Sequence, residues 1–370
     1  MTETVRTASA QMFSIDIGKT NAKCTLIDVN GSIVARRSVP SRSCATLVYP
    51  TIPIDEMLDD LREATRDLDL SKVGRMVAVT HGAAFACLGP DGLVLPVMDY
   101  EFEPDPAFAA EYDAIRPLQS ETLSPNLAQM LNAGRQLFWL ERYHADAFRN
   151  TRAIVPLAQY IGWRLGAPSV SEINSLGCHT DLWDPVAQDY STLVEARGWR
   201  ALFAPLRRAG TDLGRIDVGV ADEWRLPRDC HILNGLHDSN VDLLPYLDRT
   251  DVTVLSTGTW FVAMALCGGV EHAARRSNCG VTVAIDGRIV PTVRFLGGRA
   301  FEHGTDPAKI AVEAKHHISA LPKTARIEVV GPASANAQFV EALARSFPDR
   351  KVVASKQSTS PIANLEAAFG

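Results

Sequence analysis

The chain has 370 residues, and its composition of 46% hydrophobic and 22% charged residues is typical of a folded globular protein, which excludes disordered and fibrous classes. The 37 basic and 43 acidic side chains leave a net charge of −6 without a basic block, so we do not expect nucleic acid as a partner. No apolar run approaches the roughly 20 residues that span a bilayer, and seven scattered cysteines without a C-x-x-C pair are typical of reduced thiols, so we expect a cytoplasmic protein that does not bind membranes.

The chain begins with apolar, β-rich segments separated by short polar turns. Residues 11–17 and 23–28 flank a polar turn at 18–21, which predicts a hairpin. An Asn-Gly pair, the turn that needs positive φ at both central residues, then precedes a third strand at 33–39. These segments predict three antiparallel strands at the start of the first domain.

The rest of the first half alternates between helical and strand patterns. Apolar residues recur at helical spacing in two long segments and in one shorter segment that opens on proline, and two apolar runs between them predict strands. The predicted helices cover residues 54–64, 126–143 and 156–165, and the predicted strands cover 75–80 and 93–98. Together they indicate an α/β domain.

The second half repeats the first in outline. A strand, a small-residue turn, a strand and a hairpin follow one another again, and the spacing is too long for a solenoid. Strands are predicted at 252–256, 260–266, 280–285, 288–295, 326–330 and 351–354, with a helix at 335–346 and a short one from 361. We therefore expect two related domains that face each other across a cleft. Breaker residues at 198–229 place the boundary near 230, giving domains 1–229 and 230–370.

The first predicted turn carries the sharpest chemical signal. Asp16 ends a strand, and a glycine, a hydroxyl and amine groups follow it within one hairpin. Such a turn can hold phosphate oxygens with backbone amides. A carboxylate such as Asp16 suits this turn if Mg²⁺ lies between it and the phosphate. The groups that this interpretation assigns are Asp16, Gly18, Lys19, Thr20, Asn21 and Lys23. The alternative is a polar hairpin in which Gly18 serves only the turn.

Two further segments complete the candidate site. The turn Thr257-Gly258-Thr259 occupies the equivalent place in the second half and suits a second phosphate turn, although small-residue turns after strands are common. Asp238 lies at a strand-to-helix junction, where it either caps the helix or acts as a general base toward an alcohol. His237 precedes it and either orients Asp238 or the substrate or serves as a structural histidine.

In this order, the three segments resemble the FGGY carbohydrate kinases, within the superfamily of actin and the heat-shock chaperone ATPases. The resemblance extends along nearly the whole chain and also includes Thr80-His81-Gly82, Asp99 and the segment 172–184. It implies an α/β fold of two RNase H-like, actin-like ATPase domains across a cleft. It also implies ATP-dependent phosphorylation of a ketose or polyol.

The resemblance assigns roles to individual residues. It implies Asp238 as the general base, Asp16 and Asp238 at Mg²⁺, and the two turns at the phosphates of ATP. Sugar contacts are implied for His81, Gly82, Asp99, Glu101 and His237, and nucleotide contacts for Gly331 and Asn336. The expected partners are the sugar and ATP, and a homodimer is left open.

The chain departs from the family pattern in three places. Glu101 stands where the family commonly has arginine, which changes the set of sugar hydroxyls that the loop recognises. Pro332 interrupts the glycine-rich adenine loop, and residues 298–326 form a shorter segment than in typical members. These departures motivate an alternative function, a non-catalytic sugar- or nucleotide-binding regulatory protein. A sugar-independent ATPase is a third possibility, and fold analogy alone does not exclude it.

Overall fold

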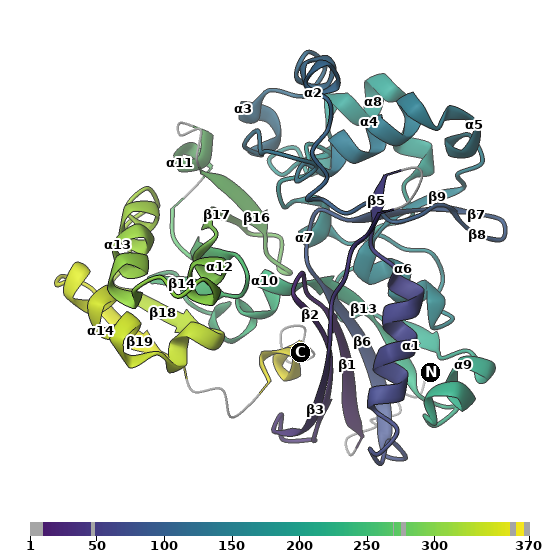
Figure 1. Ribbon diagram of the computed structural model, residues 1–370, viewed down its shortest axis with the longest axis horizontal. Coiled ribbons are helices and arrows are strands. Elements are labelled where there is room, and N and C mark those ends of the chain that lie inside the picture. The colour runs from purple at the N-terminus through teal and green to yellow at the C-terminus, as the bar shows by residue number, and fades with distance from the viewer. Residues whose placement is uncertain (1–9, 46–48, 269, 275–278, 356–359, 366–370) are drawn as a thin grey trace, which may run out of the picture.

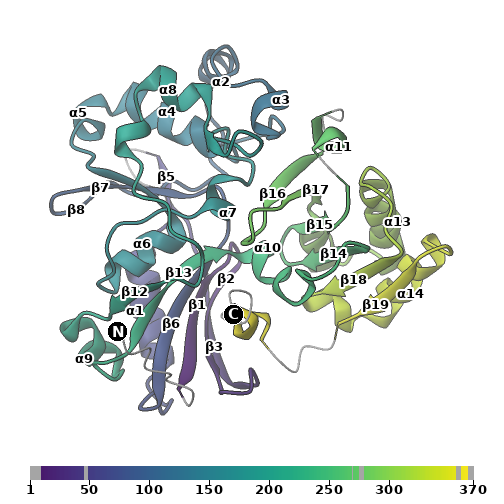
Figure 2. The same ribbon diagram turned by 180° about the vertical axis from the view of Figure 1, so that it is seen from behind.

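The computed structural model describes residues 10–45, 49–268, 270–274, 279–355 and 360–365. Within these residues the chain forms two six-stranded mixed sheets that stand side by side, each with helices against it (Figures 1 and 2). A third group of helices lies above the first sheet in Figure 1. The fold is the α/β architecture of two actin-like ATPase domains that the sequence predicts.

The first sheet has the strand order β12-β13-β6-β1-β2-β3. Its strands are β1 (Gln11–Ile17), β2 (Asn21–Ile27), β3 (Ile33–Pro40), β6 (Val73–Thr80), β12 (Asp212–Arg215) and β13 (His231–His237). Strands β1, β2 and β3 pair antiparallel, as the two predicted hairpins require, whereas β6 and β13 run parallel to β1. The carboxyl ends of β1, β6 and β13 therefore meet at one edge of the sheet.

The second sheet repeats this plan in the order β16-β17-β15-β14-β18-β19. Its strands are β14 (Val252–Thr257), β15 (Phe261–Ala265), β16 (Gly280–Val283), β17 (Ile289–Phe295), β18 (Arg326–Val330) and β19 (Lys351–Ala354). Strands β14, β15 and β17 pair antiparallel, and β18 and β19 run parallel to β14. The duplication expected from the sequence is confirmed, with β14 in the place of β1.

Both faces of the first sheet are covered, because successive side chains of a strand point to opposite sides. Met76 lies on the face that packs against α1 (Ile54–Ala64) and α6 (Leu157–Arg164). Its neighbour Val77 belongs to the other face, which packs against the C-terminal turn η4 (Pro361–Asn364). The end of the described chain thus returns to the first sheet, as Figure 2 shows.

The remaining helices form two groups. One group builds a separate apolar core above the first sheet, and the other covers the second sheet. The first group includes α2 (Pro106–Asp113), α4 (Ala133–Tyr143), α5 (Ala145–Phe148), α7 (Ile173–Leu176) and α8 (Thr192–Arg197); the second includes α12 (Gly297–Glu302), α13 (Pro307–Ile318) and α14 (Ala337–Ser346). The short segment at 298–326 is thus occupied by α12 and α13.

Two details differ from the sequence analysis. The helix predicted for 126–143 begins only at Ala133, because the buried Asn132 accepts a hydrogen bond from the backbone of Leu127 and donates one to that of Pro125, which holds the preceding residues in a loop. Strand β13 pairs with β6 in the first sheet, although the expected boundary near 230 assigns it to the second domain. The first sheet therefore extends to His237.

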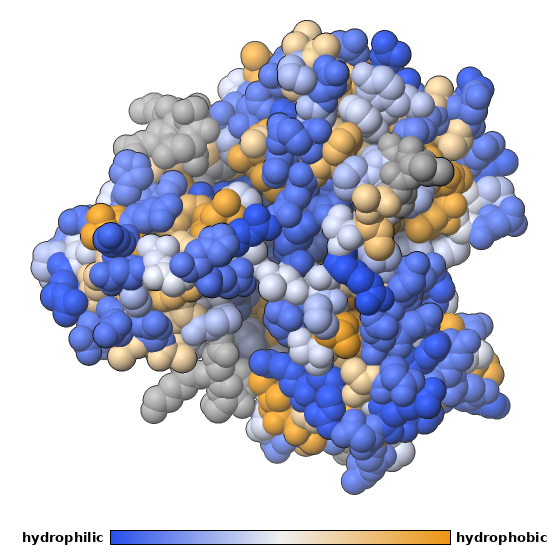
Figure 3. Space-filling view, in the orientation of Figure 1, coloured by the Kyte–Doolittle hydropathy of each residue, from blue (hydrophilic) through white to orange (hydrophobic). Residues whose placement is uncertain are grey.

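The surface carries mixed polarity. Hydrophilic residues cover most of the face in Figure 3, and hydrophobic residues are scattered among them. Within the described part of the chain, no helix combines the length and the apolar character that a membrane crossing needs.

Candidate active site

A cleft of about 790 Å³ lies between the two sheets and receives residues from both. Most of the residues that the sequence singled out line it. They are Asp16, Gly18, Lys19, Thr20, Asn21, Lys23, His81, Gly82, His237, Asp238, Thr257, Gly258, Thr259, Gly331 and Asn336. Asp99 and Glu101 do not line it, and they take part in a charge cluster described below. The carboxylates Asp16 and Asp238 therefore share one cleft.

The two candidate phosphate turns lie at corresponding places in the two sheets and meet across the cleft. In the first, between β1 and β2, the Gly18 amide donates to the Asn21 carbonyl at 3.1 Å, which closes a tight hairpin. In the second, between β14 and β15, the Gly258 amide donates to the Trp260 carbonyl at 3.2 Å. The hydroxyl oxygens of Thr20 and Thr259 are 2.6 Å apart.

A glycine allows the second turn to pack closely. An added Cβ at Gly298 would lie 2.0 Å from the carbonyl oxygen of Gly258 and 2.8 Å from that of Thr259. The first turn of α12 therefore lies directly against the 257–259 turn. A side chain at position 298 would push the two apart.

Three carboxylates gather in the cleft. Burial raises the pKa of Asp16 to about 6, against the opposing effect of Lys23, whose Nζ lies 3.7 Å from the carboxylate, and the charge of Asp238 raises it further. Burial also raises the pKa of Asp242 to about 7, although its carboxylate accepts a 2.6 Å hydrogen bond from Ser256. Asp238 and Asp16 add to this rise by repulsion. A cation would relieve this repulsion.

Asp242 is a site residue that the sequence analysis missed. It lies four residues after Asp238, at the end of the short helix α10 (Asp238–Val241). Residues four apart share one side of a helical turn, and this spacing was the available signal. The donor set of Asp16, Asp238 and Asp242 fits a hard divalent ion, since Mg²⁺ binds carboxylate oxygens and retains several waters.

Asp238 is presented to the cleft directly by the first sheet. It follows β13 without an intervening loop, and its side chain is 40% exposed. The helix cap is His237 rather than Asp238, and the carboxylate accepts only the amide and hydroxyl of the adjacent Ser239, at 2.6 and 3.2 Å. The capping interpretation is therefore wrong. The free side of this carboxylate faces the cleft, as a general base requires.

His237 lies beside Asp238, with Nε2 at 3.6 Å from the carboxylate. Burial lowers the pKa of His237, an effect that the charge of Asp238 opposes. The ring is therefore neutral at pH 7. Gly82 packs against it so closely that an added Cβ would lie 2.4 Å from Nε2. The His81-Gly82 loop thus fixes the orientation of this ring.

Lys19 and Asp99 form a close ion pair. The Lys19 ammonium lies 2.6 and 2.8 Å from the two carboxylate oxygens of Asp99 and 3.3 Å from one carboxylate oxygen of Glu101. Burial alone would raise the pKa of Asp99, but the hydrogen bond from Lys19 holds it below its ordinary value. In turn Glu101 pairs with Arg299 of the second half. These four residues link the two halves at the edge of the cleft.

The loop after β18 accommodates its proline. Gly331 has a φ of 86°, a conformation that favours glycine, and an added Cβ would lie 2.8 Å from the Thr257 backbone. Pro332 then opens the short helix η3 (Pro332–Ala335), where a missing amide is tolerated. Asn336 caps α14 by accepting a hydrogen bond from Phe339 at 2.9 Å. Gly331 therefore lies directly against the second phosphate turn.

Known proteins match the chain in sequence and in structure. Residues 249–326 match the family model described as "Carbohydrate kinase FGGY, C-terminal domain". The L-fuculokinases of Salmonella typhi and Escherichia coli strain K12 are 26% and 25% identical to this chain over 305 residues. These matches cover 78% of this chain, and the chain spans only 64% of the length of these curated relatives.

A solved carbohydrate kinase from Novosphingobium aromaticivorans is 32% identical, with a TM-score of 0.84, and the match covers 97% of this chain and 92% of that one. A ligand-bound xylulose kinase from Lactobacillus acidophilus superposes with a TM-score of 0.81 at 13% identity, covering 97% of this chain and 88% of that one. At that identity, the second similarity concerns the fold alone.

Proposed function

The chain belongs to the FGGY carbohydrate kinases, and on this basis we propose that it transfers the γ-phosphoryl group of ATP to a hydroxyl of a ketose or polyol. The observation that carries the proposal is the placement of Asp16 and Asp238 in one cleft between paired glycine turns. The L-fuculokinase relatives support a sugar as the acceptor.

In the proposed reaction, Asp238 accepts the proton of the sugar hydroxyl as its oxygen attacks the γ-phosphorus. A new oxygen–phosphorus bond forms, the bond from the γ-phosphorus to the bridging oxygen breaks, and ADP leaves with the electron pair of that bond. Positioning and charge stabilisation supply most of the rate in phosphoryl transfer, and a general base adds about 10²–10⁴-fold. The partly exposed carboxylate of Asp238 suits this role.

The remaining residues bind and orient. Gly18, Thr20, Thr257, Gly258 and Thr259 offer backbone amides and hydroxyls to the phosphates of ATP, and Gly331 and Asn336 lie beside them. Asp16 and Asp242, with Asp238, would hold Mg²⁺, which neutralises phosphate charge when bound. Lys19 affects the binding of ATP only indirectly, because its ammonium is already paired with Asp99.

The test is sugar-dependent release of ADP across a panel of ketoses and polyols, with phosphorylated product identified by mass spectrometry. Asp238→Asn should lower kcat by about 10²–10⁴-fold without abolishing sugar binding. Asp229→Asn, an exposed change outside the cleft, is the matched control. If no acceptor raises turnover above the ATP-only rate while calorimetry detects sugar binding, the chain is a non-catalytic binding protein and the proposal is wrong.

A further inference from the structure

Arg294 places an unpaired positive charge in the wall of the cleft. The residue lies on β17 of the second sheet, and its side chain is among those that line the cleft. Among the described residues its guanidinium makes no hydrogen bond or ion pair, and its Nη1 atom is buried without a partner. Burial lowers the pKa of Arg294. The side chain as a whole is half-buried, so water screens part of its charge, and an anion in the cleft would supply the partner that Nη1 lacks.

Three side chains of the first half feel the charge of Arg294. They are Cys178, His179 and His237, and burial is the larger influence on the pKa of all three. Burial raises the pKa of the Cys178 thiol and lowers those of both histidines. Asp238 also acts on Cys178 and His237, but among the described residues it makes no ion pair with Arg294. The guanidinium therefore remains available to an anion from the cleft.

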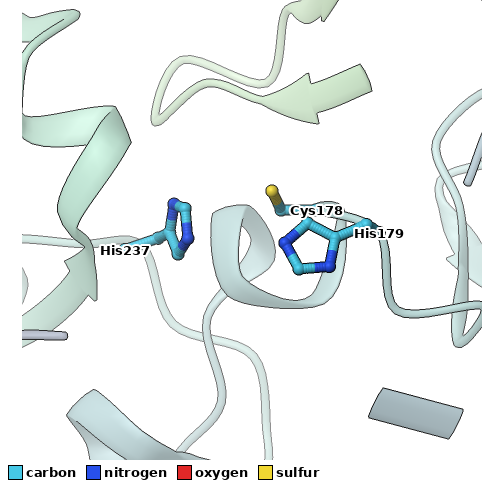
Figure 4. Close-up of side chains that lie close together, drawn as sticks. All are labelled: Cys178, His179 and His237. Carbon is cyan, nitrogen blue, oxygen red and sulfur yellow. The ribbon is translucent and has the colours of Figure 1, made fainter. Parts of the chain in front are cut away.

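The same three residues provide hydrogen-bonding groups around Arg294. Figure 4 shows the rings of His179 and His237 turned toward each other, with the sulfur of Cys178 beside them. The ring centroids are 6.5 Å apart, and Nδ1 of His179 lies 2.9 Å from the Leu131 carbonyl, to which it donates. That hydrogen bond fixes the tautomer and leaves Nε2 of His179 as an acceptor toward the cleft. Hydroxyl groups of a ligand fit such acceptors.

The charge of Arg294 acts mainly on the His237 side of the cleft. The charges that act on Asp16 and Asp242 include Lys23 and other carboxylates but not Arg294. The same guanidinium acts on His237, which adjoins the general base, and on His179, near Gly82. An anion at Arg294 would therefore belong to the acceptor rather than to the nucleotide.

We propose that the acceptor carries an anionic group, the carboxylate of a sugar acid or the phosphate of a sugar phosphate, which pairs with Arg294 while a hydroxyl group reaches Asp238. The inference rests on the proposed kinase function and adds an anionic group to the polyhydroxy acceptor. The planar guanidinium matches carboxylate and phosphate oxygens in a two-point contact, so the pairing also orients the sugar.

A transition-metal ion bound by Cys178, His179 and His237 is the alternative to an anion at this wall of the cleft. The ligand atoms of Cys178, His179 and His237 lie within 4.8 Å of one another, and thiolate with imidazole is a donor set that zinc accepts. The positive charge of Arg294 acts on all three and opposes a bound cation, whereas Asp238 acts on Cys178 and His237 and favours one. A measurement of bound zinc therefore distinguishes the two occupants.

The experiment measures binding by calorimetry, so that it does not depend on turnover. The probes are D-gluconate and D-xylonate with their neutral counterparts D-glucitol and xylitol, and D-ribulose 5-phosphate with D-ribulose. We expect one class of anion to bind at least about tenfold more tightly than its neutral counterpart. Arg294→Gln should weaken the binding of that anion roughly 10- to 100-fold, the range of a charged hydrogen bond. The affinity for neutral polyols should not change. Arg345→Gln, an exposed arginine outside the cleft lining, is the control.

Several results would overturn the inference. Neutral polyols that bind as tightly as every anion would do so, as would anion binding that survives in Arg294→Gln. One zinc per chain in protein purified without chelator, lost in Cys178→Ser, would assign the wall to a metal instead. If Arg294→Gln does not fold, the comparison of anionic and neutral probes on the unaltered protein decides. Anion binding that depends on Arg294 but gives no phosphorylated product would refute the kinase proposal and retain only the anion-binding role of Arg294. Phosphorylation of neutral sugars alone would support the kinase proposal and refute the anionic acceptor.

Discussion

The hydroxyl oxygens of Thr20 and Thr259 lie 2.6 Å apart although 239 positions separate the two residues in the sequence. One belongs to the turn after β1 and the other to the turn after β14, the corresponding strands of the two sheets. The two halves therefore touch through corresponding turns. The hydrogen bond holds the two candidate phosphate turns together at this point of the cleft.

Removing this contact should loosen both turns together. Thr20→Val and Thr259→Val each remove one hydroxyl, and each should raise the KM for ATP because a partner in the closed arrangement is lost. The two changes should not add in a double-mutant cycle, with a coupling of about 0.5–1.5 kcal/mol, the usual net value of a hydrogen bond. Additive effects on KM would mean that the hydroxyls act independently.

Asp242 should influence the metal requirement. Asp242→Asn removes one of three carboxylates from the cleft, and we expect the Mg²⁺ concentration for half-maximal activity to rise about 10- to 100-fold, the range seen when supporting groups of metal sites are lost. The kcat at saturating Mg²⁺ should change far less than in Asp238→Asn. The control is Asp248→Asn, an exposed residue outside the cleft lining. An unchanged Mg²⁺ profile would remove Asp242 from the site.

Lys19 should matter more for folding than for phosphate binding. Asp99 has a side chain only 4% exposed, and Lys19 holds it through two short contacts. Lys19→Met leaves that carboxylate buried and unpaired, which should lower the free energy of unfolding by about 3–5 kcal/mol. The double variant Lys19→Met with Asp99→Asn should recover part of the loss. Urea denaturation measures the free energy of unfolding of both variants. A single variant that is as stable as the unaltered chain but has a raised KM for ATP would indicate that Lys19 binds phosphate.

The pair between Glu101 and Arg299 should affect closure rather than stability. Both side chains are partly exposed, and such pairs contribute about 0–1 kcal/mol. Arg299→Gln should therefore unfold at nearly the same urea concentration as the unaltered chain. Because it removes a link between the halves, small-angle scattering should show a larger radius of gyration. A radius equal to that of the unaltered chain would mean that the remaining contacts suffice to hold the halves together.

Glu172 should make the stability depend on pH. Burial raises its pKa from 4.5 to about 8, although the Asn174 and Ser175 amides donate to it at 2.9 and 3.2 Å. Between these values the folded chain holds a proton that the unfolded chain releases, so this group makes stability fall as pH rises from 4.5 to 8. The slope is at most about 1.4 kcal/mol per pH unit. Glu172→Gln keeps an acceptor oxygen and should flatten this part of the profile in urea denaturation at pH 5, 7 and 9. Equal slopes in both proteins would contradict the assignment.

Features such as hairpins, which depend on residues close together in the chain, were predicted from the sequence. The hairpins around residues 18–21 and 257–259 follow from turn chemistry and alternating strands, and both turns line one cleft as expected. Asp16 and Asp238 were expected at opposite edges of that cleft, but both follow strands of the first sheet and lie on the same side of it. Long-range pairing was less accessible. The contact of β13 with β6 joins residues far apart in the sequence, and no local pattern marks it.

Charge partners were also beyond local reasoning. Lys19 and Asp99 carried separate expected roles, and only the fold, which brings together residues 80 positions apart, shows that they neutralise each other. Arg294 reads as one charged residue in an apolar strand. Its significance arises from the residues of the first half, Cys178, His179 and His237, that the fold brings within reach of its charge, and that arrangement has no counterpart in sequence spacing.

The direct passage from β13 into Asp238 has a kinetic consequence. Asp238, the proposed general base, is anchored to the same sheet as the loop of His81 and Gly82, whereas the turn at 257–259 and Arg294 belong to the other sheet. Any swing of one half relative to the other therefore keeps Asp238 and the His81-Gly82 loop together and carries the turn and Arg294 toward them. We expect an ordered mechanism in which the alcohol docks on the nucleotide-free enzyme, and product inhibition patterns would report that order.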